Sequence, residues 1–89
     1  MKHEVALVQI EKLIESKKTA IINFKLRSSI IGVFVKHEDF EHLSSKNMVR
    51  FVNKSCIDFY NKTGRVEYTK IYNTFDFTSI KTVVNESNV

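Results

Sequence analysis

The sequence predicts a mainly β domain, in which one N-terminal helix precedes a small five-stranded barrel of the SH3-like kind. In residues 4–16 the apolar side chains recur at helical spacing, whereas from Thr19 onward they alternate with polar ones as in a strand. Several short strand-like segments follow, and a glycine in the second marks a bend. Because 89 residues can bury only one core, we expect a single domain over residues 1–89.

The helix is predicted over residues 4–16, and the barrel over residues 19–84. Ala6, Ile10 and Leu13 fall on one face of the helix. Two lysines near its end suit the negative pole of the helix dipole. Residues 85–89 are expected to form a frayed tail.

The first two strands differ in how many faces they bury. In residues 20–26 apolar side chains alternate with polar ones, which predicts one buried face. Residues 30–36 are apolar on both faces, so this strand needs a second covering layer. Gly32 lies in its middle, where a glycine indicates a strand bend or a close approach of another backbone.

The rest of the chain predicts alternating polar connections and short elements. Residues 37–46 are predicted as a loop or turn, anchored by Phe40 and Leu43. Residues 55–61 predict a short helical piece, ended by Gly64 in the position that glycine prefers. The remaining strands are expected at 48–52, 66–72 and 80–84.

The formal net charge is +4, and it is unevenly distributed. Residues 46–72 hold six basic against two acidic residues, interleaved with aromatic ones, whereas residues 36–45 are net acidic. Cations and rings together are the mixture that single-stranded nucleic-acid binders use. The alternative is a half-buried sheet whose rings face the core and whose lysines face water.

Composition argues against several classes of protein. Two glycines leave no glycine-rich phosphate loop, and no apolar run is long enough for a membrane span. The single cysteine, Cys56, cannot form an internal disulfide, and no secretory leader is recognisable. We therefore expect a cytoplasmic protein that does not enter a membrane.

Two features could carry chemistry, and each has a structural alternative. His37 to His42 hold two imidazoles and three carboxylates, which could ligate a metal, but their spacing favours a solvated loop. Cys56 could be a nucleophile beside an imidazole, or a small buried residue. We expect no metal, no cofactor and no enzymatic activity.

Two segments resemble the Sm-like family, in particular the bacterial Hfq-type RNA-binding ring proteins. IIGVFVKHEDF (residues 30–40) is similar to the family's first motif, with Gly32 at the bend, Asp39 in the turn and Phe40 as the ring. SIKTVV (residues 79–84) resembles its last strand. With the segments beside these motifs, the resemblance covers roughly residues 8–40 and 78–84, about half the chain. It implies an Sm-like barrel and assembly into a ring, with the fourth strand of each subunit pairing with the fifth of the next.

The chain departs from that family at its RNA site. Asp76, Phe77 and Thr78 stand where the family has a Tyr-Lys-His run that binds uridine-rich RNA, and Asp39 stands where it usually has Gln. The resemblance therefore supports the fold more than the RNA site.

The leading functional hypothesis is a non-enzymatic Sm-like subunit that forms a homo-oligomer, for which a ring is one possible form. This subunit is expected to bind single-stranded RNA and not to recognise a DNA sequence. Phosphate contacts are predicted from Lys17, Lys18, Arg50, Lys54 and Arg65, and base stacking from Phe40 or Tyr72. The alternative is a small protein-interaction or self-assembly module that does not bind nucleic acid.

Overall fold

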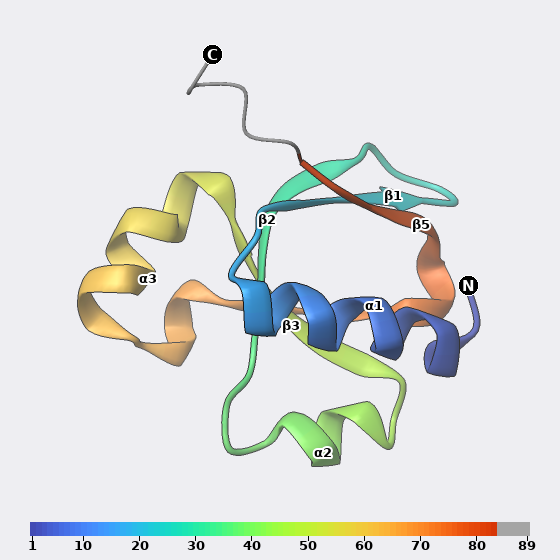
Figure 1. Ribbon diagram of the computed structural model, residues 1–89, viewed down its shortest axis with the longest axis horizontal. Helices are drawn as coiled ribbons and strands as arrows, with labels where there is room; N and C mark the ends of the chain where they lie inside the picture. Colours follow the sequence, from blue (N-terminus) through green and yellow to red (C-terminus); the bar gives the residue numbers. More distant parts are fainter. Residues whose placement is uncertain (84–89) are drawn as a thin grey trace.

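In a computed structural model, residues 1–83 form one helix packed on a five-stranded antiparallel sheet, with two short helices in the connections (Figure 1). The helices are α1 (His3–Ser16), α2 (Phe40–Ser44) and α3 (Ile57–Thr63). The strands are β1 (Ala20–Phe24), β2 (Ile30–Val35), β3 (Met48–Asn53), β4 (Lys70–Asn73) and β5 (Phe77–Thr82). Three 3-10 turns complete the chain: η1 (Lys54–Cys56), η2 (Val66–Tyr68) and η3 (Thr74–Asp76). The predicted tail 85–89, and Val84 before it, lie outside the described residues.

Helix α1 confirms the sequence prediction. Its buried face carries Ala6, Ile10 and Leu13, which join the core under β1, β2 and β5. The helix ends at Lys17, whose backbone is left-handed (φ 55°) and whose N–H donates to the carbonyl of Ile14. A left-handed residue at this point is the usual way to satisfy the last carbonyls of a helix, although glycine is the residue that does so without strain. None of the helices in the described part of the chain is long and apolar enough to cross a membrane.

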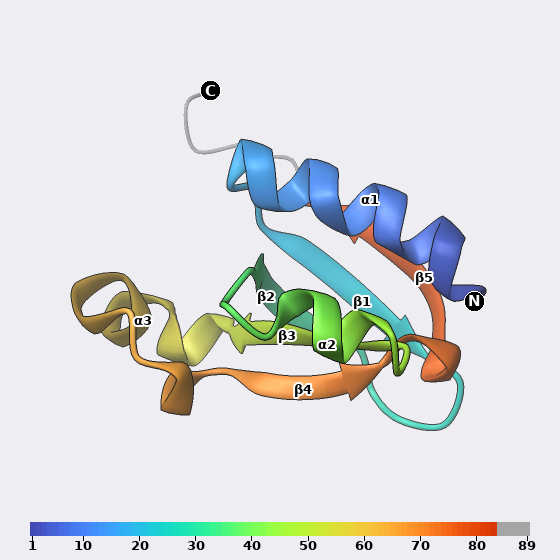
Figure 2. The same ribbon diagram turned by 90° about the horizontal axis from the view of Figure 1, so that it is seen from below.

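The sheet has the order β4-β3-β2-β1-β5 and is strongly curled (Figure 2). In a flat sheet, strands three places apart lie about 14 Å from each other. Yet the rings of Phe24 in β1 and Tyr72 in β4 have centroids 5.6 Å apart, and η3 joins β4 to β5, at opposite edges of the order, with only three residues. Within residues 1–83 no ladder joins β4 to β5. The sheet therefore folds round one core, filled by Phe34, Phe51 and Phe77 among others, and keeps two strand edges.

Gly32 is required by the closeness of β2 and β3. A Cβ at this position would collide with the carbonyl oxygen of Val52 and lie 2.8 Å from the ring of Phe51. Of the two reasons predicted for this glycine, close backbone approach is therefore directly visible.

Three differences from the sequence predictions are the most informative. Part of the predicted loop 37–46 is helix α2, because Phe40 and Leu43, three positions apart, both turn into the core. The predicted strand 66–72 begins only at Lys70, since η2 occupies residues 66–68 and the Thr69 side chain bonds back to the Val66 carbonyl. Strand β5 begins at Phe77, three residues earlier than predicted, because this ring is fully buried.

One buried polar group ties three elements together. The imidazole of His3 in α1 bonds through Nδ1 to the Thr74 hydroxyl (2.9 Å) and through Nε2 to the Ser44 hydroxyl (2.8 Å). Thr74 also donates to the carbonyl of Asn47. His3 and Thr74 are both buried, so these bonds satisfy groups that would otherwise destabilise the core.

Candidate nucleic-acid interface

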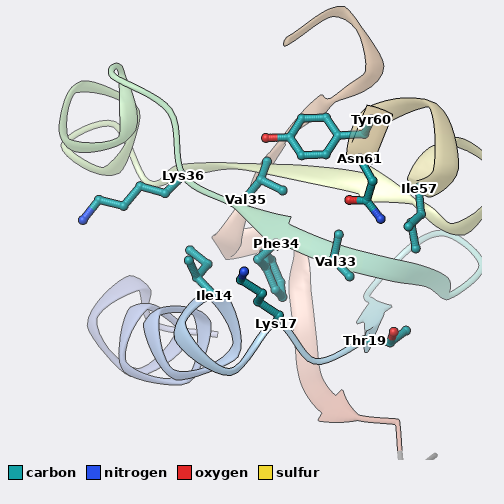
Figure 3. Close-up of a pocket in the computed structure, with 10 residues that line it drawn as sticks. All are labelled: Ile14, Lys17, Thr19, Val33, Phe34, Val35, Lys36, Ile57, Tyr60 and Asn61. Atoms are coloured by element: carbon teal, nitrogen blue, oxygen red, sulfur yellow. The ribbon is translucent and has the colours of Figure 1, made fainter. Parts of the chain in front are cut away.

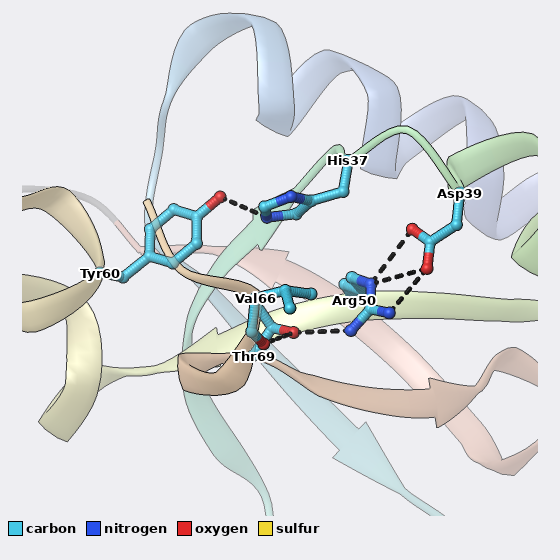
Figure 4. Close-up of polar contacts among 6 residues, drawn as sticks. All are labelled: His37, Asp39, Arg50, Tyr60, Val66 and Thr69. Atoms are coloured by element: carbon cyan, nitrogen blue, oxygen red, sulfur yellow. Dashed lines mark hydrogen bonds and ion pairs between the residues drawn. The ribbon is translucent and has the colours of Figure 1, made fainter. Parts of the chain in front are cut away.

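Arg50, one of the predicted phosphate contacts, is held by a carboxylate. Its Nε donates to both carboxylate oxygens of Asp39, and its Nη2 donates to Asp39 Oδ2 at 2.6 Å (Figure 4). Its Nη1 donates to the Thr69 hydroxyl. The Arg50 side chain is 16% exposed. The Arg50 guanidinium therefore links β3 to the start of α2 and to the residue before β4, and most of its donors are used within the fold.

This ion pair changes the acid–base properties of its members. The hydrogen bond from Arg50, aided by its charge, holds the pKa of Asp39 below the ordinary value, and the bond to Asp39 raises the pKa of Arg50. Burial raises the pKa of the neighbouring Tyr60 phenol, whose oxygen lies 2.8 Å from His37 Nε2. The Asp39 carboxylate is therefore charged and paired with the Arg50 guanidinium, so the two charges offset each other.

The two rings predicted to stack on bases pack against other side chains of the fold. Phe40 is 7% exposed, and the Lys36 ammonium lies 5.0 Å from the centre of its ring. Tyr72 packs against Phe24, and the Arg27 guanidinium lies 5.5 Å from the Tyr72 ring. Neither predicted ring presents a free face comparable to that of an exposed aromatic residue.

The other predicted cations are exposed but do not form one cluster. Lys17 and Lys18 follow α1, while Lys54 and Arg65 flank α3. Arg65 pairs with Glu67 at 2.7 Å, and both side chains are more than 60% exposed. Such an exposed pair is weak and leaves guanidinium donors free.

The structure reveals an exposed aromatic pair that the sequence analysis did not single out. Phe59 in α3 stacks on Tyr68 in η2, with ring centroids 5.8 Å apart and planes 17° apart. Phe59 remains 57% exposed. Exposed basic side chains lie along the same stretch of chain: Lys54, Lys62, Arg65 and Lys70. We call Phe59 and Tyr68, with these four cations, the aromatic platform. Its only sequence signal was the basic, ring-rich composition of residues 46–72.

A groove of about 440 Å³ lies on the other side of α3, between α3, β2 and the end of α1 (Figure 3). Its apolar lining is Ile14, Val33, Phe34, Val35 and Ile57. Its polar lining is Lys17, Thr19, Lys36, Tyr60 and Asn61. The second apolar face of β2, which the sequence predicted to need a covering layer, is thus only partly covered.

The two features considered for other chemistry are engaged in local contacts. In the His37–His42 segment, His37 faces Tyr60 and Asp39 binds Arg50. Among residues 1–83, no three His, Cys, Asp or Glu side chains converge as metal ligands would. The Cys56 sulfur lies 3.9 Å from the Ser55 hydroxyl.

Comparison with known proteins adds no relative: no family model matches the chain, and neither curated proteins nor solved structures give a significant match.

Proposed function

We propose that this chain is a non-enzymatic subunit with an Sm-like barrel, which assembles with copies of itself and binds single-stranded RNA on the aromatic platform. The observation that carries RNA binding is the Phe59–Tyr68 stack, with Phe59 57% exposed, in a stretch of chain that also carries four exposed basic side chains. Base stacking on an aromatic face contributes about 1–3 kcal/mol per base, and nearby cations attract the phosphates.

The RNA contacts proposed from the structure differ in part from those predicted from the sequence. Arg50, Phe40 and Tyr72 are engaged inside the fold, whereas Lys54 and Arg65 belong to the platform. Two carboxylates, Asp58 and Glu67, accompany the four cations, so the segment keeps a positive balance. We expect moderate affinity with little base preference, because every base has a face that can stack.

Titration of a labelled uridine-rich oligonucleotide tests RNA binding. If about three phosphates are neutralised, raising salt from about 50 to about 200 mM should weaken binding roughly 20-fold. Phe59→Ala should weaken it at least about fivefold through lost stacking. Phe75→Ala is the matched control, because Phe75 is also about half exposed (49%) but lies in η3, outside the platform. Absent or salt-independent binding would contradict the proposal, as would equal effects of the two variants.

Self-assembly is supported by the two edges of the sheet. β4 and β5 end the order β4-β3-β2-β1-β5, and unpaired edges are normally paired, covered or charged in stable proteins. In the proposed assembly, β4 of one copy pairs with β5 of the next, which continues the sheet from subunit to subunit and leaves neither edge unpaired. Such head-to-tail pairing closes into a ring when the rotation per subunit allows it.

The mass in solution tests this part of the proposal. A multiple of the 10.4 kDa chain mass is expected, and Ile71→Lys should lower it, because Ile71 lies on β4 and is 44% exposed. Val8→Lys is the matched control, since Val8 is similarly exposed (56%) but lies on α1. A monomeric wild-type chain would exclude assembly through these edges.

The second candidate function is a protein-interaction or self-assembly module that does not bind RNA. It is favoured by the internal engagement of Arg50, Phe40 and Tyr72. Replacing Lys54 and Arg65 by Glu separates the two functions: loss of RNA retention supports the first, and RNA-independent recovery of the same partner protein supports the second.

A further inference from the structure

The groove beside β2 has the dimensions of a ligand site. Its volume of about 440 Å³ lies within the range of small-molecule pockets, about 300–1,000 Å³. It is bounded by the end of α1, by β2 and by α3, so a ligand there would contact three elements that are far apart in sequence (Figure 3).

The lining of the groove combines three kinds of chemistry. Val33, Val35 and Ile57 offer an apolar surface, and the Tyr60 ring lies beside it. Asn61 contributes an amide, which can donate and accept hydrogen bonds. Lys17 lies at the groove as a cation, and no carboxylate is among its lining residues in the described chain. A fitting ligand is anionic, partly apolar and able to pair along one polar edge.

The Tyr60 ring is held in place before any ligand arrives. Its hydroxyl bonds to His37 Nε2 at 2.8 Å, and the two rings meet edge to face with centroids 5.8 Å apart. A side chain fixed in this way loses little conformational freedom on binding, which favours affinity.

The groove and the aromatic platform are adjacent. Phe59 and Tyr60 are consecutive in α3, and consecutive helical residues point about 100° apart. Phe59 accordingly stacks on Tyr68 in η2, whereas Tyr60 faces β2. A strand lying on the platform can therefore cross α3 and place a neighbouring nucleotide in the groove.

We propose that this groove binds one unstacked nucleotide of single-stranded RNA. The base lies on Val33 and Val35 beside Tyr60, its polar edge pairs with the Asn61 amide, and its phosphate is bound by Lys17. An alkyl anion would use the same apolar surface and the same cation, but it has no polar edge for Asn61. The inference rests on the proposed RNA binding and adds a second, chemically distinct contact to it.

A nuclear magnetic resonance titration of the full chain tests the inference directly. Uridine 5′-monophosphate and adenosine 5′-monophosphate should each shift the methyl signals of Val33 and Val35 and the side-chain amide of Asn61. Lys17→Gly should weaken this binding roughly threefold, as expected for one exposed ion pair. It should not unfold the chain, because glycine suits the left-handed backbone at this position. Lys18→Ala is the matched control, since Lys18 is an exposed neighbour outside the groove lining.

Asn61→Ala is a second variant. It should not unfold the chain, because the Asn61 side chain is exposed and alanine is a good helix former. This substitution should weaken the binding of both nucleotides without changing the binding of inorganic phosphate. Saturable shifts by decanoate but not by nucleotides would overturn the inference in favour of an alkyl anion. The absence of saturable shifts with any of these probes would overturn it altogether.

The failures of the two proposals can be told apart. If the oligonucleotide binds and depends on Phe59 but the groove signals stay unchanged, only the nucleotide groove is wrong. If the monophosphates bind in the groove but no oligonucleotide is retained, the groove is a site for free nucleotides, and both RNA binding and the assignment of the groove to RNA are wrong.

Discussion

The curled sheet and the α3–η2 segment use apolar residues in opposite ways. In the sheet, Ile22, Phe51 and Val52 are fully buried. Across residues 54–69 no residue is buried, and Phe59 is 57% exposed. Exposed apolar side chains that contribute little to a core, in a segment that also carries exposed cations, are typical of a binding surface rather than of a structural element.

This contrast predicts a separation of effects. Substitutions in the sheet should lower stability, and with it every activity. Substitutions in residues 54–69 should change binding while the free energy of unfolding stays nearly constant. The following variants test that separation, from the largest expected effect on stability to the smallest.

Gly32→Ala should lower the stability of the sheet strongly. The added methyl group would collide with the Val52 carbonyl, which belongs to the β2–β3 ladder, so the strands must separate. We expect a loss of about 3 kcal/mol or more in the free energy of unfolding, at the upper end of overpacking effects. Denaturant unfolding measures it, and Gly64→Ala is the comparison: its φ of 65° is strained for alanine, but no atom lies near the new methyl group. If the two variants lost equal free energies of unfolding, the close approach of the Val52 backbone to Gly32 would not be what requires glycine there.

Asp39→Asn should lower stability by about 1 kcal/mol at pH 7, because it removes the charge paired with Arg50 while Asp39 is partly exposed. Since the folded pKa of Asp39 is lowered, its contribution is complete above the ordinary value of 3.8 and is lost as the pH falls through the lower folded pKa. Urea unfolding at pH 7 and below pH 3.8 should therefore show the wild type and the variant converging in acid. Glu67→Gln, in the exposed pair with Arg65, should have almost no effect at either pH.

Lys17→Gly should raise stability by about 0.5–1 kcal/mol, because Lys17 has a left-handed backbone that costs an ordinary residue energy. Thermal unfolding measures the gain. Lys18→Gly should lower stability slightly, since no positive φ favours glycine there. A lower midpoint for Lys17→Gly would show that the Lys17 side chain stabilises the end of α1.

Phe59→Ala should change the free energy of unfolding by less than about 0.5 kcal/mol, since an exposed ring contributes little to the core. Phe51→Ala, in the sheet, should cost about 3–5 kcal/mol. If Phe59→Ala proved comparably costly, the α3–η2 segment would be part of the structural core, and the contrast between the two regions would fail.

Local patterns predicted the regular elements well. The apolar face of α1, the alternation in β1 and the glycine that ends α3 depend on neighbours within a few residues. The start of β5 escaped prediction because Phe77, which anchors it, is buried by distant parts of the chain. Phe40 and Leu43 were expected to anchor their segment, but two apolar residues three positions apart did not distinguish helix α2 from a turn.

The candidate site was less predictable for the same reason. Arg50 looked free because nothing in the sequence shows that Asp39, eleven positions earlier at the start of α2, would bind it. The Phe59–Tyr68 stack joins residues nine positions apart across a turn, which no helical or strand period indicates. Composition alone could place a basic aromatic region there, and only the fold selects the exposed ring.

The bonds of His3 have a consequence for folding order. They join residues 41 and 71 positions apart, so the loops they close cost much chain entropy before any bond is gained. The β1–β2 pair, by contrast, closes over a short hairpin. We expect the local β1–β2 and β2–β3 pairings to form first and the N-terminal turn of α1 to dock later. Amide hydrogens of this turn should then exchange with solvent faster than those of β2 and β3, through an opening that leaves the sheet intact.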